Sequence, residues 1–243
     1  MRSNAARPDV TTAYVLNNLS RLPVTFGLIA TCVAVYVAVA LAGQGYGYPL
    51  NFGLVTQPPD VLAQGALAPA AVADGRVWLL LSSMFLHSGF IHLALNMVSL
   101  YFLGSFVEQA FGRSRFLALY LSSGLAGGIA YLYFGTFDRS AVGASGAIFG
   151  LLGGVLGYSV RRGTFSWQNP LIRQLLILTA VNLYVGFSIP NISNTAHIGG
   201  LLGGAAFGWL TAPTVYSSKT LRTATPTIIL FGAELILLAL WLQ

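Results

Sequence analysis

The stretch that decides the fold is residues 143–160, GASGAIFGLLGGVLGYSV, an apolar run in which glycine recurs every one to four positions. It is long enough to cross most of the ~30 Å apolar core of a bilayer as a helix. A second run, residues 196–212, reads AHIGGLLGGAAFGWLTA and repeats the pattern. Glycines four residues apart let helix backbones approach closely in lipid. The two runs therefore predict a pair of tightly packed membrane helices.

The composition of the whole chain agrees with a membrane location. Of 243 residues, 12 are basic and 6 acidic, so 7% are charged, against roughly a quarter in a soluble domain. Hydrophobic residues make up 56%, and the mean hydropathy is +0.74. These values exclude a soluble globule and a soluble nucleic-acid binder. The single cysteine, Cys32, excludes a disulfide framework and a cysteine-rich zinc site. We therefore expect an all-α polytopic membrane protein.

Apolar runs and basic residues together predict the topology. We expect spans at residues 22–42, 90–111, 116–134, 144–160, 171–187, 196–212 and 226–242. The connections between spans lie alternately on the two faces of the membrane. Those at one face carry the basic residues Arg2, Arg7, Arg21, Arg113, Arg115, Arg161, Arg162, Arg173, Lys219 and Arg222. The other face has Arg76 and Arg139. The positive-inside bias then puts the N-terminus in the cytoplasm and the C-terminus outside.

The expected spans divide the chain into three parts. Residues 1–21 form a cytoplasmic N-terminal segment, in which no removable signal peptide is expected. Residues 22–212 form a six-span core, with a long extracellular loop at 43–78. Residues 213–243 form a cytoplasmic linker and a seventh transmembrane helix.

Polar residues gather where the second, fourth and sixth spans begin, and these three helices run in the same direction. His92 and Asn96 are four residues apart and so face the same way, whereas His87 points ~140° away from His92. Ser145 opens the fourth span, and His197 opens the sixth. Because such groups are costly to bury without partners, they indicate a functional cavity that water can enter.

A hydroxyl and an imidazole at the ends of two closely packed helices suit nucleophilic catalysis. His197 would take the proton of Ser145, and the N-terminal N–H groups of the fourth span would stabilise an oxyanion. Asn96 and His92 are the candidate side-chain donors. No aspartate is placed to orient His197, which predicts a dyad rather than a triad. No His-Glu-x-x-His motif is present, so we expect neither a metal site nor a cofactor.

At these residues the sequence resembles the rhomboid family of intramembrane serine proteases. The motifs that carry the resemblance are His-x4-His-x3-Asn (His87, His92, Asn96), Gly-x-Ser-Gly (Gly143, Ser145, Gly146), Ala-His-x2-Gly-x3-Gly (Ala196, His197, Gly200, Gly204) and Gly104-x3-Glu108-x3-Gly112. The family's Trp-Arg pair is here Trp78-Leu79. The resemblance implies a rhomboid-like six-helix core plus one C-terminal transmembrane helix (6+1). It also implies that Phe149 packs on the catalytic histidine.

The resemblance further implies an intramembrane serine endopeptidase in the cell membrane. It would cleave single-span membrane proteins near the outer face, through a Ser145–His197 dyad and an acyl-enzyme, with these substrates and the lipid bilayer as its partners. The alternative is a non-catalytic rhomboid-like factor that binds membrane proteins, although such proteins typically lack the serine or the histidine. A small-solute transporter would need an inverted repeat or paired broken helices, and the sequence displays neither.

Overall fold

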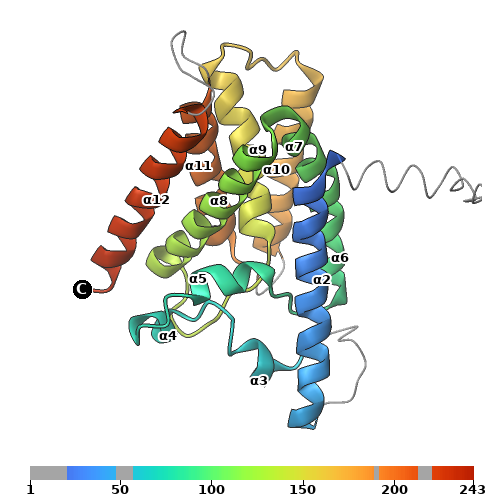
Figure 1. Ribbon diagram of the computed structural model, residues 1–243, viewed down its shortest axis with the longest axis vertical. Helices are drawn as coiled ribbons and strands as arrows, with labels where there is room; N and C mark the ends of the chain where they lie inside the picture. Colours follow the sequence, from blue (N-terminus) through green and yellow to red (C-terminus); the bar gives the residue numbers. More distant parts are fainter. Residues whose placement is uncertain (1–20, 48–56, 189–191, 213–220) are drawn as a thin grey trace, which may run out of the picture.

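The structure, a computed structural model, describes residues 21–47, 57–188, 192–212 and 221–243, and these are mostly helical (Figure 1). Long helices run side by side along the long axis of the molecule. They are α2 (Pro23–Gly43), α8 (Arg113–Phe134), α9 (Ser145–Arg161), α10 (Pro170–Ser188), α11 (Asn194–Thr211) and α12 (Leu221–Trp241). A further helix consists of α6 (Phe90–Ser99), the π-helical turn η3 (Leu100–Gly104) and α7 (Ser105–Phe111).

These helices coincide with the apolar runs of the sequence, so the expected all-helical membrane protein is confirmed. Four segments are long and apolar enough to cross a bilayer by length and composition: Pro23–Tyr46, Phe90–Phe111, Arg113–Phe134 and Ala224–Trp241. The glycine-rich α9 and α11 lie among them (Figure 1). The count of seven spans and the cytoplasmic N-terminus stay predictions.

Local sequence signals set where the helices begin and end. Pro23 and Pro170 stand at the first positions of α2 and α10, where the missing N–H costs no intrahelical hydrogen bond. Gly112 adopts a φ of +85° between α7 and α8, a left-handed conformation that favours glycine. Ser193 precedes α11, and its Oγ accepts a hydrogen bond from the N–H of Ala196 at 3.3 Å.

The centre of the fold is the contact of α9 with α11, where glycines of one helix lie directly against backbone of the other. A Cβ atom added to Gly200, Gly204 or Gly208 would overlap the carbonyl group of Gly146, Gly150 or Gly154, respectively. Each successive pair lies one helical turn further along both helices. Helix α8 packs against both: a Cβ on Gly127 would come within 2.6 Å of the carbonyl oxygen of Ala196 in α11, and one on Gly124 would lie 3.3 Å from the Cβ of Ala147 in α9. These glycines therefore set the distance between the helices.

Short helices between α2 and α6 cover the end of the molecule at which α9 and α11 begin (Figure 1). They are α3 (Pro59–Leu62), α4 (Pro69–Ala73), α5 (Leu79–Ser82) and the 3-10 turn η2 (Ser83–Phe85). Leu67 and Ala141 form an antiparallel bridge with two N–H···O bonds of 2.9 Å. The N–H of Gly143 donates to the carbonyl of Ser83 at 2.9 Å. This region therefore fixes the loop that leads into α9.

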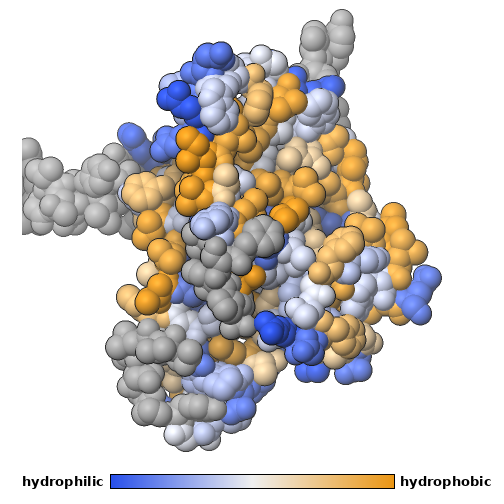
Figure 2. Space-filling model, turned by 180° about the vertical axis from the view of Figure 1, so that it is seen from behind, coloured by the Kyte–Doolittle hydropathy of each residue, from blue (hydrophilic) through white to orange (hydrophobic). Residues whose placement is uncertain are grey.

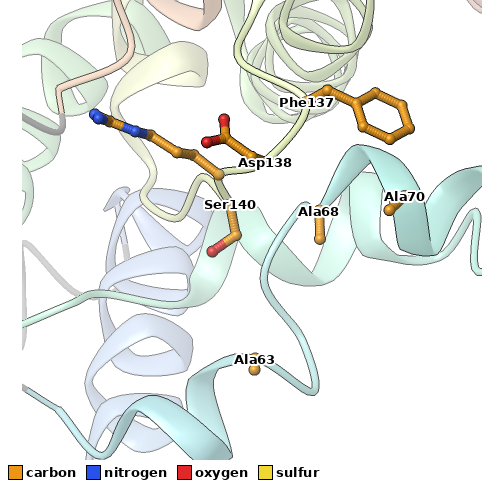
Figure 3. Close-up of a pocket in the computed structure, with 7 residues that line it drawn as sticks. Ala63, Ala68, Ala70, Phe137, Asp138 and Ser140 are labelled. Atoms are coloured by element: carbon orange, nitrogen blue, oxygen red, sulfur yellow. The ribbon is translucent and has the colours of Figure 1, made fainter.

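A pocket lies on the surface at this end of the molecule, between the region of α3 and α4 and the connection from α8 to α9 (Figure 3). Alanines from the region of α3 and α4 form one wall, and the connection between α8 and α9 forms the other. The lining residues are Ala63, Ala68, Ala70, Phe137, Asp138, Arg139 and Ser140. The pocket lies outside the helix interface between α9 and α11.

Glu108 joins α7 to the beginning of α2. Its carboxylate, 3% exposed, accepts hydrogen bonds from the N–H of Val24 at 3.1 Å and the N–H of Thr25 at 2.8 Å. The hydroxyl of Thr25 donates to the same carboxylate at 2.7 Å. A carboxylate at a helix N-terminus satisfies free N–H groups and is favoured by the helix dipole. Glu108 thus links two helices that are far apart in the sequence.

Replacing Glu108 by alanine is expected to lower the free energy of unfolding by about 3 kcal/mol, since buried donors lose a charged acceptor. Thr25→Val removes one of the three hydrogen bonds and should cost about 1 kcal/mol. Thermal unfolding in detergent micelles measures both. Gln109→Ala, at the exposed neighbouring position, is the control and should leave the midpoint unchanged. Equal midpoints for Glu108→Ala and the wild type would show that Glu108 does not stabilise the contact.

Candidate active site

Ser145 and His197 lie at the same end of the α9 and α11 pair. Ser145 is the first residue of α9, and His197 lies in the first turn of α11. The distance between Ser145 Oγ and His197 Nε2 is 2.8 Å, which is a hydrogen bond. His197 is buried, and Ser145 is partly exposed. The structure therefore brings together the hydroxyl and the imidazole that the sequence predicted to meet.

The backbone around Ser145 offers donors for a negative charge. The N–H groups in the first turn of a helix have no intrahelical acceptor, and they lie at the positive end of the helix dipole. The first intrahelical bond at this end runs from Ile148 N–H to the carbonyl of Ala144, at 3.0 Å. Backbone N–H groups beside Ser145 are thus available to an oxygen atom bound there.

The His197 ring is fixed by stacking. The rings of Phe149 and His197 are nearly parallel, at 13°, with centroids 4.4 Å apart. Phe149 therefore packs on this histidine, as the family resemblance implied. Among the described residues, His197 Nδ1 has no hydrogen-bond partner. Since Nε2 faces the hydroxyl, the neutral tautomer that can accept its proton carries hydrogen on Nδ1.

His92 and Asn96 lie one turn apart on α6, and His92 Nε2 reaches the site beside Gly143. Ser88 Oγ lies 3.1 Å from His92 Nδ1, and the Asn96 amide donates to the carbonyl of His92 at 2.8 Å. Asn96 is buried, whereas His92 is partly exposed. The role of Ser88 escaped the sequence reasoning. Its position four residues before His92 is a signal that could have suggested it.

Gly143 shows how close His92 comes to Ser145. Gly143 has a φ of +130°, and a Cβ atom there would lie 2.8 Å from His92 Nε2 and 3.7 Å from Ser145 Oγ. Both side chains therefore border the small space that the glycine leaves open. An oxygen atom in that space would lie beside the hydroxyl, the imidazole of His92 and the start of α9. The geometry suits an oxyanion site.

His87 packs against His92, and the contact that the structure shows for its ring is with that residue. It is 1% exposed, and its ring meets the ring of His92 edge-on with centroids 5.1 Å apart. Burial, followed by the neighbouring His92, lowers the pKa of His87 to about 3, so its ring is neutral at physiological pH. Within the described part of the chain, no three His, Cys, Asp or Glu side chains form a group that could hold a metal ion.

The sequence was compared with protein families and with curated proteins. The family model described as "Rhomboid domain" matches residues 74–214, more than half of the chain, and this range contains every candidate site residue. "RHOMBOID-like protein 5" of Arabidopsis thaliana is 41% identical over 167 residues, which cover 67% of this chain and 53% of that protein.

Two proteins of Bacillus subtilis (strain 168) are also similar. "Rhomboid protease GluP" is 38% identical over 149 residues, 61% of this chain and 29% of that protein. "Putative rhomboid protease YdcA" is 36% identical over 139 residues, 57% of this chain and 69% of that protein. The aligned part thus spans about half or less of the first two relatives.

Proposed function

The chain belongs to the rhomboid family, and from this we propose that it is a serine endopeptidase that cleaves membrane proteins inside the bilayer. The observation that carries the proposal is the 2.8 Å hydrogen bond between Ser145 Oγ and His197 Nε2. Two relatives of this chain carry the name rhomboid protease. The chain itself is a multi-pass membrane protein, and the proposed location is the cell membrane.

The proposed reaction uses the two side chains as a dyad. Ser145 Oγ attacks the carbonyl carbon of a peptide bond, and its proton passes to His197 Nε2. The C–N bond then breaks, and the same proton is delivered to the leaving amine. Water then attacks the acyl ester and gives one proton to His197. The ester C–O bond breaks, the carboxylic acid product leaves, and His197 returns the proton to Ser145 Oγ. His197 Nδ1 has no hydrogen-bond partner in the described part of the chain, and the Phe149 ring stacks on the imidazole, which supports orientation by packing rather than by a carboxylate.

We assign the stabilisation of the oxyanion to backbone N–H groups and to two side chains of α6. Backbone N–H at the start of α9 would donate together with His92 Nε2 and the Asn96 amide. The hydrogen bond between Ser88 and His92 Nδ1 supports this assignment, because it orients the ring with Nε2 toward Gly143. A hydrogen on Nε2 requires that Nδ1 accept from the Ser88 hydroxyl.

Changing Asn96 or His92 to alanine is expected to lower kcat about 10²-fold, with a smaller change in KM, because the lost donor acts on the charge of the transition state. Rates of cleavage of a single-span reporter in proteoliposomes measure the effect. Ser99→Ala, an exposed position at the end of α6, is the matched control and should cleave at the wild-type rate. If kcat is unchanged in both donor variants, these side chains do not stabilise the oxyanion.

The proposed topology places the dyad near the outer membrane face. Residues 1–21 would lie in the cytoplasm, residues 22–212 would form the six-span catalytic core, and residues 213–243 would add a linker and a seventh span. The arginines at the ends of α9 and α10 opposite the dyad support this orientation. A single-span substrate must unwind locally to expose a carbonyl, so helix-breaking residues near its outer end should favour cleavage.

The location of the cut tests this proposal. Purified protein is incubated in proteoliposomes with a single-span reporter, and the termini of the products are determined by mass spectrometry. We expect cleavage within the outer half of the reporter's membrane segment. Binding of the reporter without any product would instead support a non-catalytic factor that retains membrane proteins.

A further inference from the structure

Charged side chains are unevenly shared between the two ends of the helix bundle. At the end where α9 stops and α10 starts, the charged residues of the described chain with exposed or partly exposed side chains are arginines: Arg21, Arg113, Arg115, Arg161, Arg162 and Arg173. Glu108, the acidic residue of the described chain at this end, is buried against α2. The opposite end carries Arg76 and Arg139 together with Asp60, Asp74 and Asp138. Figure 2 shows hydrophilic side chains gathered at the upper end of the view, next to a band of hydrophobic ones.

Exposed aromatic side chains lie among three of these arginines. We define the arginine–aromatic patch as Arg161, Arg162, Phe165, Trp167, Arg173 and Trp209. Its three arginines are exposed. Of the aromatic side chains, Phe165 is 43% exposed, Trp167 is 56% exposed and Trp209 is 41% exposed. The patch thus combines fixed positive charge with large apolar rings that the protein leaves uncovered.

The connection between α9 and α10 is built by hydrogen bonds that hold its backbone in place. Gly163 has a φ of +68°, which lets the chain turn back at the end of α9. The carbonyl of Ser159 then accepts from the N–H of Thr164 at 3.0 Å and of Phe165 at 3.2 Å. Asn169 Oδ1 accepts from the N–H of Leu171 at 3.0 Å, which caps α10. The loop therefore presents its aromatic rings on an ordered backbone.

Arg161 is oriented by a second contact. Its guanidinium carbon lies 5.1 Å from the centroid of the Trp209 ring, a cation–π arrangement. A cation–π contact engages the face of a guanidinium, whereas its N–H groups donate in its plane. A planar guanidinium matches two oxygens of a phosphate group. Tryptophan rings prefer the headgroup layer of a bilayer, and exposed phenylalanine rings are buried at the boundary between headgroups and acyl chains.

We propose that the arginine–aromatic patch binds the headgroup of an anionic phospholipid of the phosphatidylglycerol class. The arginines bind the phosphate, and Phe165 and Trp167 lie in the surrounding interfacial layer. A zwitterionic lipid also carries a phosphate, but its ammonium group cancels the net charge that three arginines attract. The inference rests on the charges and rings of this end of the molecule and stands independently of the proposed protease function.

The four tryptophans of the chain allow a direct test, because they fall at opposite ends. Trp167 and Trp209 belong to the patch, whereas Trp78 and Trp241 lie at the other end of the bundle. The patch reporter is the full chain with Trp78→Phe and Trp241→Phe, and the matched reporter carries Trp167→Phe and Trp209→Phe. Each is reconstituted into phosphatidylcholine vesicles containing an equal fraction of either brominated phosphatidylglycerol or brominated phosphatidylcholine, which quench tryptophan fluorescence on contact.

We expect the patch reporter to be quenched more strongly by the brominated anionic lipid, and the matched reporter to be quenched equally by both lipids. Adding Arg161→Gln, Arg162→Gln and Arg173→Gln should abolish the preference, with a loss of about fivefold in relative affinity for each arginine. Arg76→Gln with Arg139→Gln should leave it intact. Equal quenching of the patch reporter by both lipids, or a preference that survives the three substitutions, would overturn the proposal.

Trp241 donates a hydrogen bond to the carbonyl of Leu132 at 3.0 Å, so Trp241→Phe could affect folding. A second measurement therefore uses the chain with all four tryptophans. Native mass spectrometry counts the lipids retained after release from micelles that contain both phospholipids in equal amounts. Retention of phosphatidylglycerol over phosphatidylcholine, lost in the triple arginine variant, would support the site. Equal retention of both lipids would contradict it.

Discussion

Substituting alanine for Ser145 or for His197 is expected to lower the rate of intramembrane cleavage at least ~10⁴-fold. The nucleophile and its base act as one unit through the 2.8 Å hydrogen bond, so removing either should cost nearly as much as removing both. The rate of the double variant should therefore be at most about tenfold lower than the rate of either single variant. Initial rates with a single-span reporter in proteoliposomes, at matched protein amounts, provide the measurement.

The control for this experiment is Ser159→Ala on the same helix. Ser159 lies at the far end of α9, where its hydroxyl donates to the carbonyl of Val155 at 2.8 Å, and this variant should cleave at close to the wild-type rate. Products released equally by the wild type and the Ser145 and His197 variants would remove the dyad from the reaction. Loss of cleavage in all variants, Ser159→Ala included, would point to a general failure of folding.

Substitution of Gly204 by alanine is expected to disrupt the structure and the site together. A Cβ atom there would overlap the backbone of Gly150, which cannot move aside as a flexible side chain would. Overpacking against backbone should cost about 3 kcal/mol or more and lower the unfolding midpoint by about 10 °C. Pushing α11 away from α9 also displaces His197 from Ser145, and a shift of ~1 Å in a reacting group can cost ~10²-fold in rate.

Gly27→Ala and Gly232→Ala serve as matched controls within α2 and α12. Among the described residues, no atom lies within 4 Å of a Cβ atom built at either position. Both variants should unfold within about 2 °C of the wild type and keep its activity. Thermal unfolding in micelles and reporter cleavage are measured on the same preparations. The proposed role of the glycine contact fails if Gly204→Ala behaves like the two controls.

The parts of the fold that follow from local pattern could be read from the sequence. Apolar runs predicted the long helices, because a helix in lipid satisfies its own backbone polar groups over a fixed length. The glycine spacing at residues 143–160 and 196–212 predicted that two of these helices pack closely. It followed that Ser145 and His197, at matching ends of parallel helices, would meet, and the structure has them in hydrogen-bond contact.

Long-range hydrogen bonds could not be read in this way. Glu108 accepts a hydrogen bond from the N–H of Thr25, 83 positions away. No sequence pattern around either residue indicates the other as its partner. The bridge between Leu67 and Ala141 joins two loops whose sequences show no periodicity. The π-helical turn η3 (Leu100–Gly104) interrupts an apolar run that reads as one regular helix. The first two features depend on tertiary packing rather than on local preference.

Glu234 illustrates the same limit in the last helix. An ionisable residue in a membrane span suggests a function by default, but the sequence named no partner for it. In the structure Glu234 is buried where α12 packs against the bundle, and within the described residues its Oε2 makes no hydrogen bond. Burial of this kind arises from the way α12 docks, which a single apolar run does not reveal.

The central claim is that His197 activates the Ser145 hydroxyl as a nucleophile. The most direct measurement is covalent labelling of the purified, folded protein with a fluorophosphonate, followed by peptide mapping. The account predicts one phosphonate adduct on Ser145 in the wild type and none in the His197→Ala variant, whose hydroxyl lacks its base. An adduct on a different serine, or equal labelling of Ser145 with and without His197, would contradict it.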